Sequence, residues 1–113
     1  MKETGNAVLL RIFIGESDHY QGKHLYKHIV EWLRRNHYKG VTVLRGVEGY
    51  GEASVIHTSD ILELSSDLPV VVEIVDSVDK INHLKEVIEE EQWIKSGLIT
   101  EEPVAIIRYG KLG

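Results

Sequence analysis

The chain has 113 residues, of which 42% are hydrophobic and 27% are charged, and this predicts one globular domain spanning residues 1–113. It has no cysteine, which excludes disulfides, thiolate nucleophiles and cysteine metal sites. No apolar run approaches the roughly 18 residues of a membrane span, and the N-terminus does not resemble a signal peptide. The net charge of −5 argues against general nucleic-acid binding. We therefore expect a cytoplasmic protein that inserts into no membrane.

The first half of the chain predicts a strand, a helix and a second strand. Residues 7–14 are mostly apolar and predict the first strand. Residues 21–38 have helical periodicity, and residues 41–45 predict the second strand. The apolar stripe of the helix consists of Leu25, Ile29, Trp32 and Leu33.

A glycine-rich hexapeptide, GVEGYG at residues 46–51, follows the second strand. Glycine tolerates positive φ and lets another backbone or a ligand approach closely. The segment therefore predicts the start of a long loop over about residues 46–66, part of which can form a hairpin. Without further information a plain turn is the simpler interpretation.

The second half predicts a strand, a helix and a last strand. Residues 67–69 form a turn, and residues 70–75 are the strongest strand prediction in the sequence. Ser77 can cap the second helix. Residues 101–103 predict a break before the last strand, residues 104–109. The core stripe of the second helix is Ile81, Leu84, Val87 and Ile88.

The order βαββαβ predicts an α+β ferredoxin-like sandwich, an antiparallel four-stranded sheet with two helices on one face. Both faces of the strands are rich in apolar residues, including Leu9 and Phe13 on the second face. Two helices cannot cover both faces, so we expect other copies of the chain to bury the second. Arg11, Glu73 and Arg108 interrupt that apolar surface and could pair across it, or could be ordinary rim charges.

Several segments resemble the PII signal-transduction proteins and, more closely, a poorly characterised PII-like family. The PII-like pieces are GVTV (40–43), VEGYG (47–51), HT (57–58) and PVVVEIV (69–75). The pieces shared with the uncharacterised family are LRIFIGE (10–16), GKHLY (22–26), TVLRG (42–46) and DLPV (67–70). The resemblance covers nearly the whole chain.

This resemblance implies a homotrimer whose sheets line a central core, with nucleotide sites in the clefts between subunits. The positions that match nucleotide-binding positions of PII proteins are Thr42, Gly49, Gly51, Glu73, Ile74, Val75 and Arg108. From the residues alone, Arg45 offers a charged fork suited to phosphate, and Tyr50 could stack on a base. Backbone N–H groups at Gly49 and Gly51 can form an anion-binding concavity.

The chain departs from PII proteins where they carry a glycine-rich loop, TGxIGDGK. Here the region reads KSGLITEE (95–102), in which Gly97 is the remaining match and Glu101 and Glu102 replace later positions. Acidic residues at this place would repel a polyphosphate. We therefore expect AMP or ADP as the ligand rather than ATP.

Histidines offer an alternative function. His24 and His28 have the i, i+4 spacing of metal ligands, but no third ligand is evident, so a solvated helix face is favoured and no metal is predicted. Ser54, His57 and Asp60 contain the residue types of a hydrolase triad, but no nucleophile elbow accompanies them. His57 could instead contact a ligand phosphate or act as an ordinary loop histidine.

The sequence thus favours a PII-like homotrimeric regulator, not an enzyme, whose loop responds to an adenine nucleotide and contacts a target protein. Alternatives are a small metal-binding or hydrolytic enzyme and a purely structural oligomer. The predicted nucleotide-binding residues are Thr42, Arg45, Gly49, Tyr50, Gly51, Glu73, Val75 and Arg108.

Overall fold

The computed structural model describes residues 1–49, 57–58 and 67–110. Within these ranges an antiparallel sheet has the strand order β4–β7–β1–β8. Its strands are β1 (Lys2–Gly15), β4 (Thr42–Arg45), β7 (Pro69–Asp76) and β8 (Leu98–Tyr109). The helices are α1 (Leu25–Arg35) and α2 (Val78–Glu90), and the short hairpins are β2 (His19–Tyr20) with β3 (Lys23–His24) and β5 (Glu48–Gly49) with β6 (His57–Thr58).

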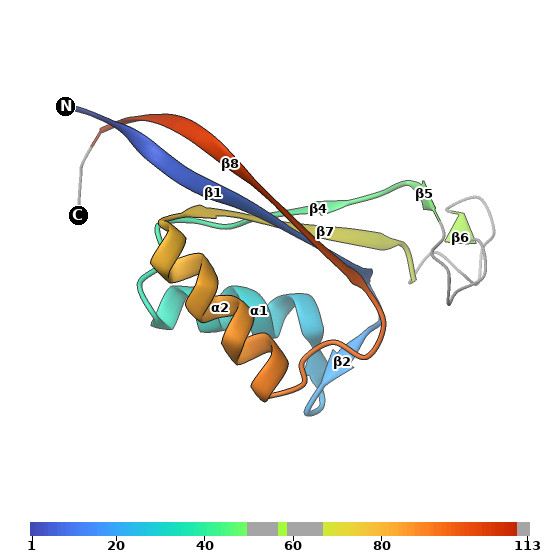
Figure 1. Ribbon diagram of the computed structural model, residues 1–113. Coiled ribbons are helices and arrows are strands. Elements are labelled where there is room, and N and C mark those ends of the chain that lie inside the picture. Colours follow the sequence, from blue (N-terminus) through green and yellow to red (C-terminus); the bar gives the residue numbers. More distant parts are fainter. Residues whose placement is uncertain (50–56, 59–66, 111–113) are drawn as a thin grey trace.

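Both helices lie on the same side of the sheet (Figure 1). The predicted α+β ferredoxin-like fold, with the order βαββαβ for its main elements, is therefore confirmed. No helix in the described part of the chain is long and apolar enough to cross a membrane.

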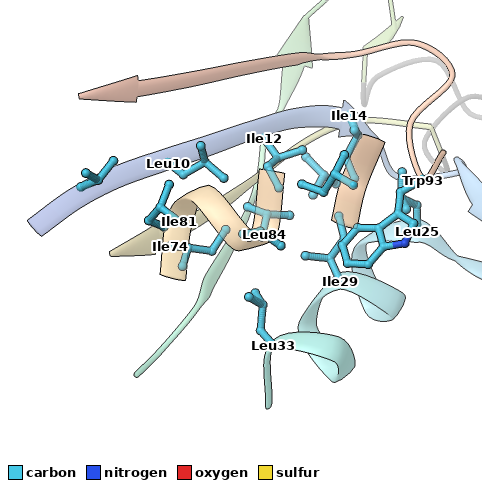
Figure 2. Packing of buried hydrophobic residues seen from close by; sticks show 14 residues of the cluster. Leu10, Ile12, Ile14, Leu25, Ile29, Leu33, Ile74, Ile81, Leu84 and Trp93 are labelled. Carbon is cyan, nitrogen blue, oxygen red and sulfur yellow. The ribbon is translucent and has the colours of Figure 1, made fainter. Parts of the chain in front are cut away.

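The core fills the space between the sheet and the helices (Figure 2). Alternate residues of β1 and β7 face the helices, because side chains in a strand point to opposite faces in turn. The fully buried residues from the sheet include Leu10, Ile12, Val72 and Ile74. The helices and the segment after α2 contribute Leu25, Ile29, Leu33, Ile81, Leu84, Ile88 and Trp93.

The second helix begins where its sequence predicts. The side chain of Ser77 accepts a hydrogen bond from the Lys80 N–H at 3.2 Å, which caps α2. The negative charge of Asp79 in the first turn interacts favourably with the positive end of the helix dipole. Just before the cap, the buried carboxylate of Asp76 accepts hydrogen bonds from the Lys39 and Ser77 N–H groups, at 2.9 and 2.8 Å.

The first helix is shorter than the predicted span of residues 21–38. Residues 21–24 instead form the turn and the second strand of the β2–β3 hairpin, with Gln21 and Gly22 at φ of 50° and 80°. The helix ends at Arg35, and His37 follows at a φ of 63°. Positive φ is incompatible with a continuing right-handed helix, so both ends of the prediction were wrong. Trp32, placed in the predicted stripe, is half-buried.

The last strand is longer than predicted, since residues 101–103 continue β8 rather than break it. β8 is an edge strand paired with β1, and an edge strand accommodates proline where no ladder hydrogen bond is needed. Glu101 and Glu102 point to opposite faces, and each forms an ion pair. Their partners are Lys85 of α2, with Nζ 2.5 Å from Glu101 Oε1, and Arg11 of β1.

The other face of the sheet, here called the open face, is not covered by either helix (Figure 1). Its apolar residues include Phe13, Leu44 and Leu98, whose exposed fractions are 36%, 48% and 58%. At its centre Arg11 Nε lies 2.9 Å from Glu73 Oε2, and Arg11 Nη1 lies 2.9 Å from Glu102 Oε1. The second apolar surface expected from the strand pattern is thus present, and it contains a cation between two carboxylates.

Candidate functional site

The base of the predicted loop lies at the end of the sheet opposite to the termini (Figure 1). The Gly46 N–H donates to the Pro69 carbonyl at 2.7 Å, which joins the segment leaving β4 to the start of β7. Glu48 and Gly49 then pair with Thr58 and His57. Part of the predicted loop is therefore a hairpin stem.

Two glycines of this base allow a close approach to Pro69. A Cβ atom at position 46 would lie 2.8 Å from Pro69 Cγ, and one at position 49 would lie 3.1 Å from the same atom. Neither glycine has a positive φ. Gly46 and Gly49 are thus favoured here by the close packing of their backbone against the Pro69 ring rather than by unusual dihedral angles.

The turn after β1 binds the chain where it returns toward β7. The Glu16 N–H donates to the Leu68 carbonyl at 2.8 Å. The Ser17 hydroxyl lies 2.5 Å from Asp67 Oδ1, and the Ser17 N–H donates to the same oxygen at 3.3 Å. The segment that leads into β7 is consequently hydrogen-bonded both to the turn after β1 and to the segment that leaves β4.

Arg45 is the cation of this site, and Glu16 is its partner. Arg45 Nη2 donates to Glu16 Oε2 in a charge-assisted hydrogen bond. The Arg45 side chain is 60% exposed, whereas the Glu16 side chain is only 13% exposed. The other carboxylate oxygen, Glu16 Oε1, is buried and has no hydrogen-bond partner among the described residues. The pair thus joins an accessible guanidinium to a largely buried carboxylate.

Thr42, Glu73 and Val75 lie along the sheet rather than at the loop base. Thr42 is directly opposite Glu73 in the β4–β7 pairing, and Val75 is opposite Leu9 in the β1–β7 pairing. The hydrogen bonds that Arg11 donates to the carboxylates of Glu73 and Glu102 raise the pKa of Arg11. The predicted pairing of Arg11 with Glu73 across the open face is therefore present.

Arg108 is far from the other candidate residues within one chain. It lies opposite Glu3, with Arg108 Nε 3.6 Å from Glu3 Oε1. Arg11 is eight positions after Glu3 in β1, which corresponds to roughly 26 Å along an extended strand. A single subunit thus does not bring Arg108 to the level of Thr42 and Glu73. Arg108 also takes no part in the Arg11 ion pairs.

The remaining candidates are Tyr50 and Gly51, which lie outside the described residues. The same holds for Ser54 and Asp60, two members of the alternative triad. The third member, His57, is described as part of β6. These predictions therefore stay predictions.

His24 and His28 do not share a solvated helix face. His24 is the N-cap position of α1, and its Nδ1 lies 2.9 Å from the Glu16 carbonyl oxygen. His28 packs between Tyr20 and Trp93, with ring centroids at 4.6 and 4.7 Å, and burial lowers its pKa. The described residues contain no group of three or more potential ligands that could hold a metal ion.

Sequence reasoning missed Glu16 as part of the site. In the sequence Glu16 appears only as the last residue of the segment LRIFIGE (10–16), and no local pattern pairs it with Arg45, 29 positions away. The pairing arises because β1 and β4 lie on either side of β7, run in the same direction and finish at the same end of the sheet. A signal was available in principle, since an acidic residue directly follows one strand and a basic residue ends the other.

The chain matches the model of the DUF190 family, described as an uncharacterized ACR, over residues 7–106. It is 41% identical over 99 residues to a UPF0166 protein of Aquifex aeolicus (strain VF5), covering 88% of this chain and 91% of that protein. A UPF0166 protein of Methanocaldococcus jannaschii is 41% identical over 78 residues, covering 69% and 71% of the two chains.

Solved structures of PII-like proteins share the fold. CPII of Thiomonas intermedia K12, a nitrogen regulatory PII-like protein solved with ADP, AMP and bicarbonate, has a TM-score of 0.69 at 13% identity, covering 92% of this chain and 91% of that one. A putative PII-like signaling protein of Thermus thermophilus has a TM-score of 0.66 at 18% identity, covering 92% of each chain. The chain is therefore a member of the DUF190 (UPF0166) family and has the ferredoxin-like fold of PII-like proteins.

Proposed function

We propose that this protein is a cytoplasmic PII-like regulator that binds an adenine nucleotide between the subunits of a homotrimer. The observation that carries the proposal is the exposed guanidinium of Arg45 at the loop base, in a fold shared with a PII-like protein solved with ADP and AMP. An accessible guanidinium next to the backbone N–H groups of a glycine-rich segment is suited to binding a phosphate group. The binding event, rather than a chemical reaction, is the function.

The open face supports assembly into an oligomer. Phe13, Leu44 and Leu98 expose apolar surface beside the Arg11–Glu73–Glu102 ion pairs. Contiguous apolar surface of this kind usually marks an interface, and identical subunits bury it most simply through rotational symmetry. Three copies packed through this face would form a closed core, with the helices outside.

A trimer would also offer a way to place Arg108 near the other candidate residues, which one chain does not do. Thr42, Gly49, Tyr50, Gly51, Glu73 and Val75 belong to one side of the proposed cleft, with Arg45 as the phosphate ligand. Because Arg108 lies at the opposite end of its own sheet, it can complete this site only if a neighbouring subunit supplies it. The proposal therefore requires the oligomer for binding.

We propose AMP or ADP rather than ATP as the ligand. The acidic residues Glu101 and Glu102 lie in β8 and not in a loop, and each carboxylate is already paired with a cation. Their repulsion of a polyphosphate is consequently weaker than the sequence suggested. The preference now depends chiefly on the small number of accessible cations at the loop base, of which Arg45 is the one described.

The regulatory output is contact between the loop at residues 46–66 and a target protein. Nucleotide binding would shift the population of loop conformations, because the ligand binds some of them more tightly than others. No covalent step is needed for such a signal. Retention of a target by the nucleotide-bound protein, and its release without nucleotide, would identify the output.

Calorimetric titration of the purified oligomer with AMP, ADP and ATP tests the proposal directly. We expect saturable heat with AMP or ADP and weaker binding of ATP. The variant Gly49→Val should abolish binding while leaving the oligomer intact, because the side chain meets Pro69 and intrudes on the loop base. Gly40→Val is the matched control, since a Cβ at position 40 has no atom within 4 Å. An absence of heat with all three nucleotides would refute the proposed function.

A further inference from the structure

The cation proposed for phosphate binding is already occupied in the chain itself. Arg45 Nη2 donates to Glu16 Oε2, so one of the guanidinium nitrogens already faces a carboxylate before any ligand arrives. A phosphate that binds Arg45 bidentately through its two Nη groups needs this Nη2 donor. Ligand and Glu16 therefore compete for one group.

We propose that Glu16 is an internal competitor of the anionic ligand, and that nucleotide binding displaces its carboxylate from Arg45. This inference rests on the proposed function. It adds that the affinity for nucleotide is set partly by an acidic residue of the same subunit. Glu16 thereby acts as an autoinhibitory contact at the phosphate position.

The two partners differ in how freely they can move. Glu16 is held through its backbone, whose N–H donates to the Leu68 carbonyl at 2.8 Å, and the adjacent Ser17 is bonded to Asp67. Its side chain is 13% exposed, against 60% for Arg45. The long and exposed arginine side chain can change its conformation, whereas the carboxylate stays where the turn places it. Exchange therefore takes place by movement of Arg45.

Displacement leaves a carboxylate that few groups can satisfy. Glu16 Oε1 is buried without a hydrogen-bond partner among the described residues, and Oε2 has Arg45. When Arg45 turns toward a phosphate, a largely buried carboxylate loses this ion pair, and an unpaired buried charge is unfavourable. The ligand has to overcome this loss, so Glu16 lowers the observed affinity.

The ion pair between Lys23 and Glu31 provides a control, because both of its side chains are exposed to solvent. Its side chains are 45% and 49% exposed, and Lys23 Nζ lies 2.5 Å from Glu31 Oε1. Water can solvate both partners if they separate, so breaking this pair has little effect. Glu31→Gln therefore changes the net charge by the same amount as Glu16→Gln without affecting a buried carboxylate.

The decisive experiment compares AMP and ADP binding to the wild type, Glu16→Gln and Glu31→Gln by calorimetry on the intact oligomer. We expect Glu16→Gln to bind roughly fivefold more tightly than the wild type, the range of one partly exposed ion pair. Glu31→Gln should bind like the wild type. Detectable nucleotide binding by Glu16→Gln, with none by the wild type or Glu31→Gln, would also support the inference, because Glu16 would then block binding completely.

The outcomes separate this inference from the function on which it rests. If the wild type binds nucleotide and Glu16→Gln binds it equally well or more weakly, the competition is refuted and the proposed function stays intact. No heat in any of the three proteins refutes both. If Glu16→Gln does not fold, the inference can still be tested by NMR spectroscopy of the wild type. The Nε–Hε resonance of Arg45 should shift on saturation with AMP, and an unchanged resonance would contradict the exchange.

Discussion

The two faces of the sheet use the same strands for different purposes. On the covered face, Ile12 and Ile74 are fully buried against α1 and α2, and the contacts are complete within one chain. On the open face, Phe13 and Leu44 stay partly exposed, and Arg11 joins Glu73 and Glu102 in their midst. The first face forms the core of the chain, and the second stays partly exposed and is the surface that the proposed oligomer would bury.

The charges explain why the faces are not interchangeable. Arg11 has two carboxylate partners that each accept a hydrogen bond at 2.9 Å, so a neighbouring subunit can cover this region without leaving an unpaired cation. On the covered face the buried charged residue is Asp76, at the end of β7, where backbone N–H groups satisfy it. Arg11 on the open face and Asp76 beside the covered face thus both have hydrogen-bond partners within the chain.

The largest expected effect is the loss of a side chain from the covered face. Ile12→Ala should lower the free energy of unfolding by about 2–5 kcal/mol, because a fully buried side chain leaves a cavity. Leu44→Ala, at an open-face residue that is 48% exposed, should cost less than about 1 kcal/mol in isolated subunits. Urea unfolding monitored by circular dichroism measures both. Equal losses in the oligomer would show that assembly buries the open face as fully as the helices bury the other.

A charge on the open face should separate the subunits without unfolding them. Phe13→Glu is expected to raise the dissociation constant of the oligomer by roughly a hundredfold, because the carboxylate would be buried without a partner. Sedimentation velocity over a dilution series measures this change.

The control for that charge is Val78→Glu, which adds the same group at an exposed position in the first turn of α2, where an acidic residue favours the helix dipole. Dissociation by both variants alike would indicate general charge repulsion. An unchanged oligomer in Phe13→Glu would exclude the open face as the interface.

Gly97 should matter for stability because it lies against the end of β1, just before β8 begins. A Cβ at this position would lie 2.7 Å from the Phe13 carbonyl oxygen, and that backbone atom cannot move aside easily. Gly97→Ala is expected to lower the free energy of unfolding by about 1–3 kcal/mol. Gly5→Ala, where no atom lies within 4 Å of the added Cβ, serves as the control in thermal or urea melts. Equal stability of the two variants would contradict this interpretation of the contact.

The smallest expected effect concerns pH and the helix layer. Burial lowers the pKa of His28, with added contributions from Lys23 and Arg35 that the nearby Glu91 and Glu31 oppose. The unfolded chain therefore binds this proton more readily than the folded chain, so stability falls as the pH drops below the ordinary value of about 6.5.

Replacing His28 by Phe should remove this part of the pH dependence, which we expect to be well under about 1 kcal/mol because the ring remains partly solvated. Urea unfolding between pH 5 and 8, at one protein concentration, compares the slopes. His83→Phe is the control, since the His83 side chain is 61% exposed. An identical slope in His28→Phe and the wild type would contradict the assignment.

Local sequence signals predicted the main strands, the second helix and its cap, because each depends on residues close together in the chain. The ends of α1 and β8 were predicted less well. Positive φ at Gln21 and His37 and strand pairing around Pro103 depend on contacts that no local pattern contains. For the candidate site, the sequence indicated Arg45 and the glycines, but not the pairing of Arg45 with Glu16.

The sequence by itself determined the order of the main elements, the two apolar faces of the strands and the PII-like resemblance, since periodicity and motifs are properties of neighbouring residues. Only the tertiary structure decided that the glycines at 46 and 49 pack on Pro69 and that Glu16 holds the cation of the loop base. It also decided that Arg108 stands apart from the other candidate residues. These outcomes depend on sheet order and register, which bring distant segments together and separate others.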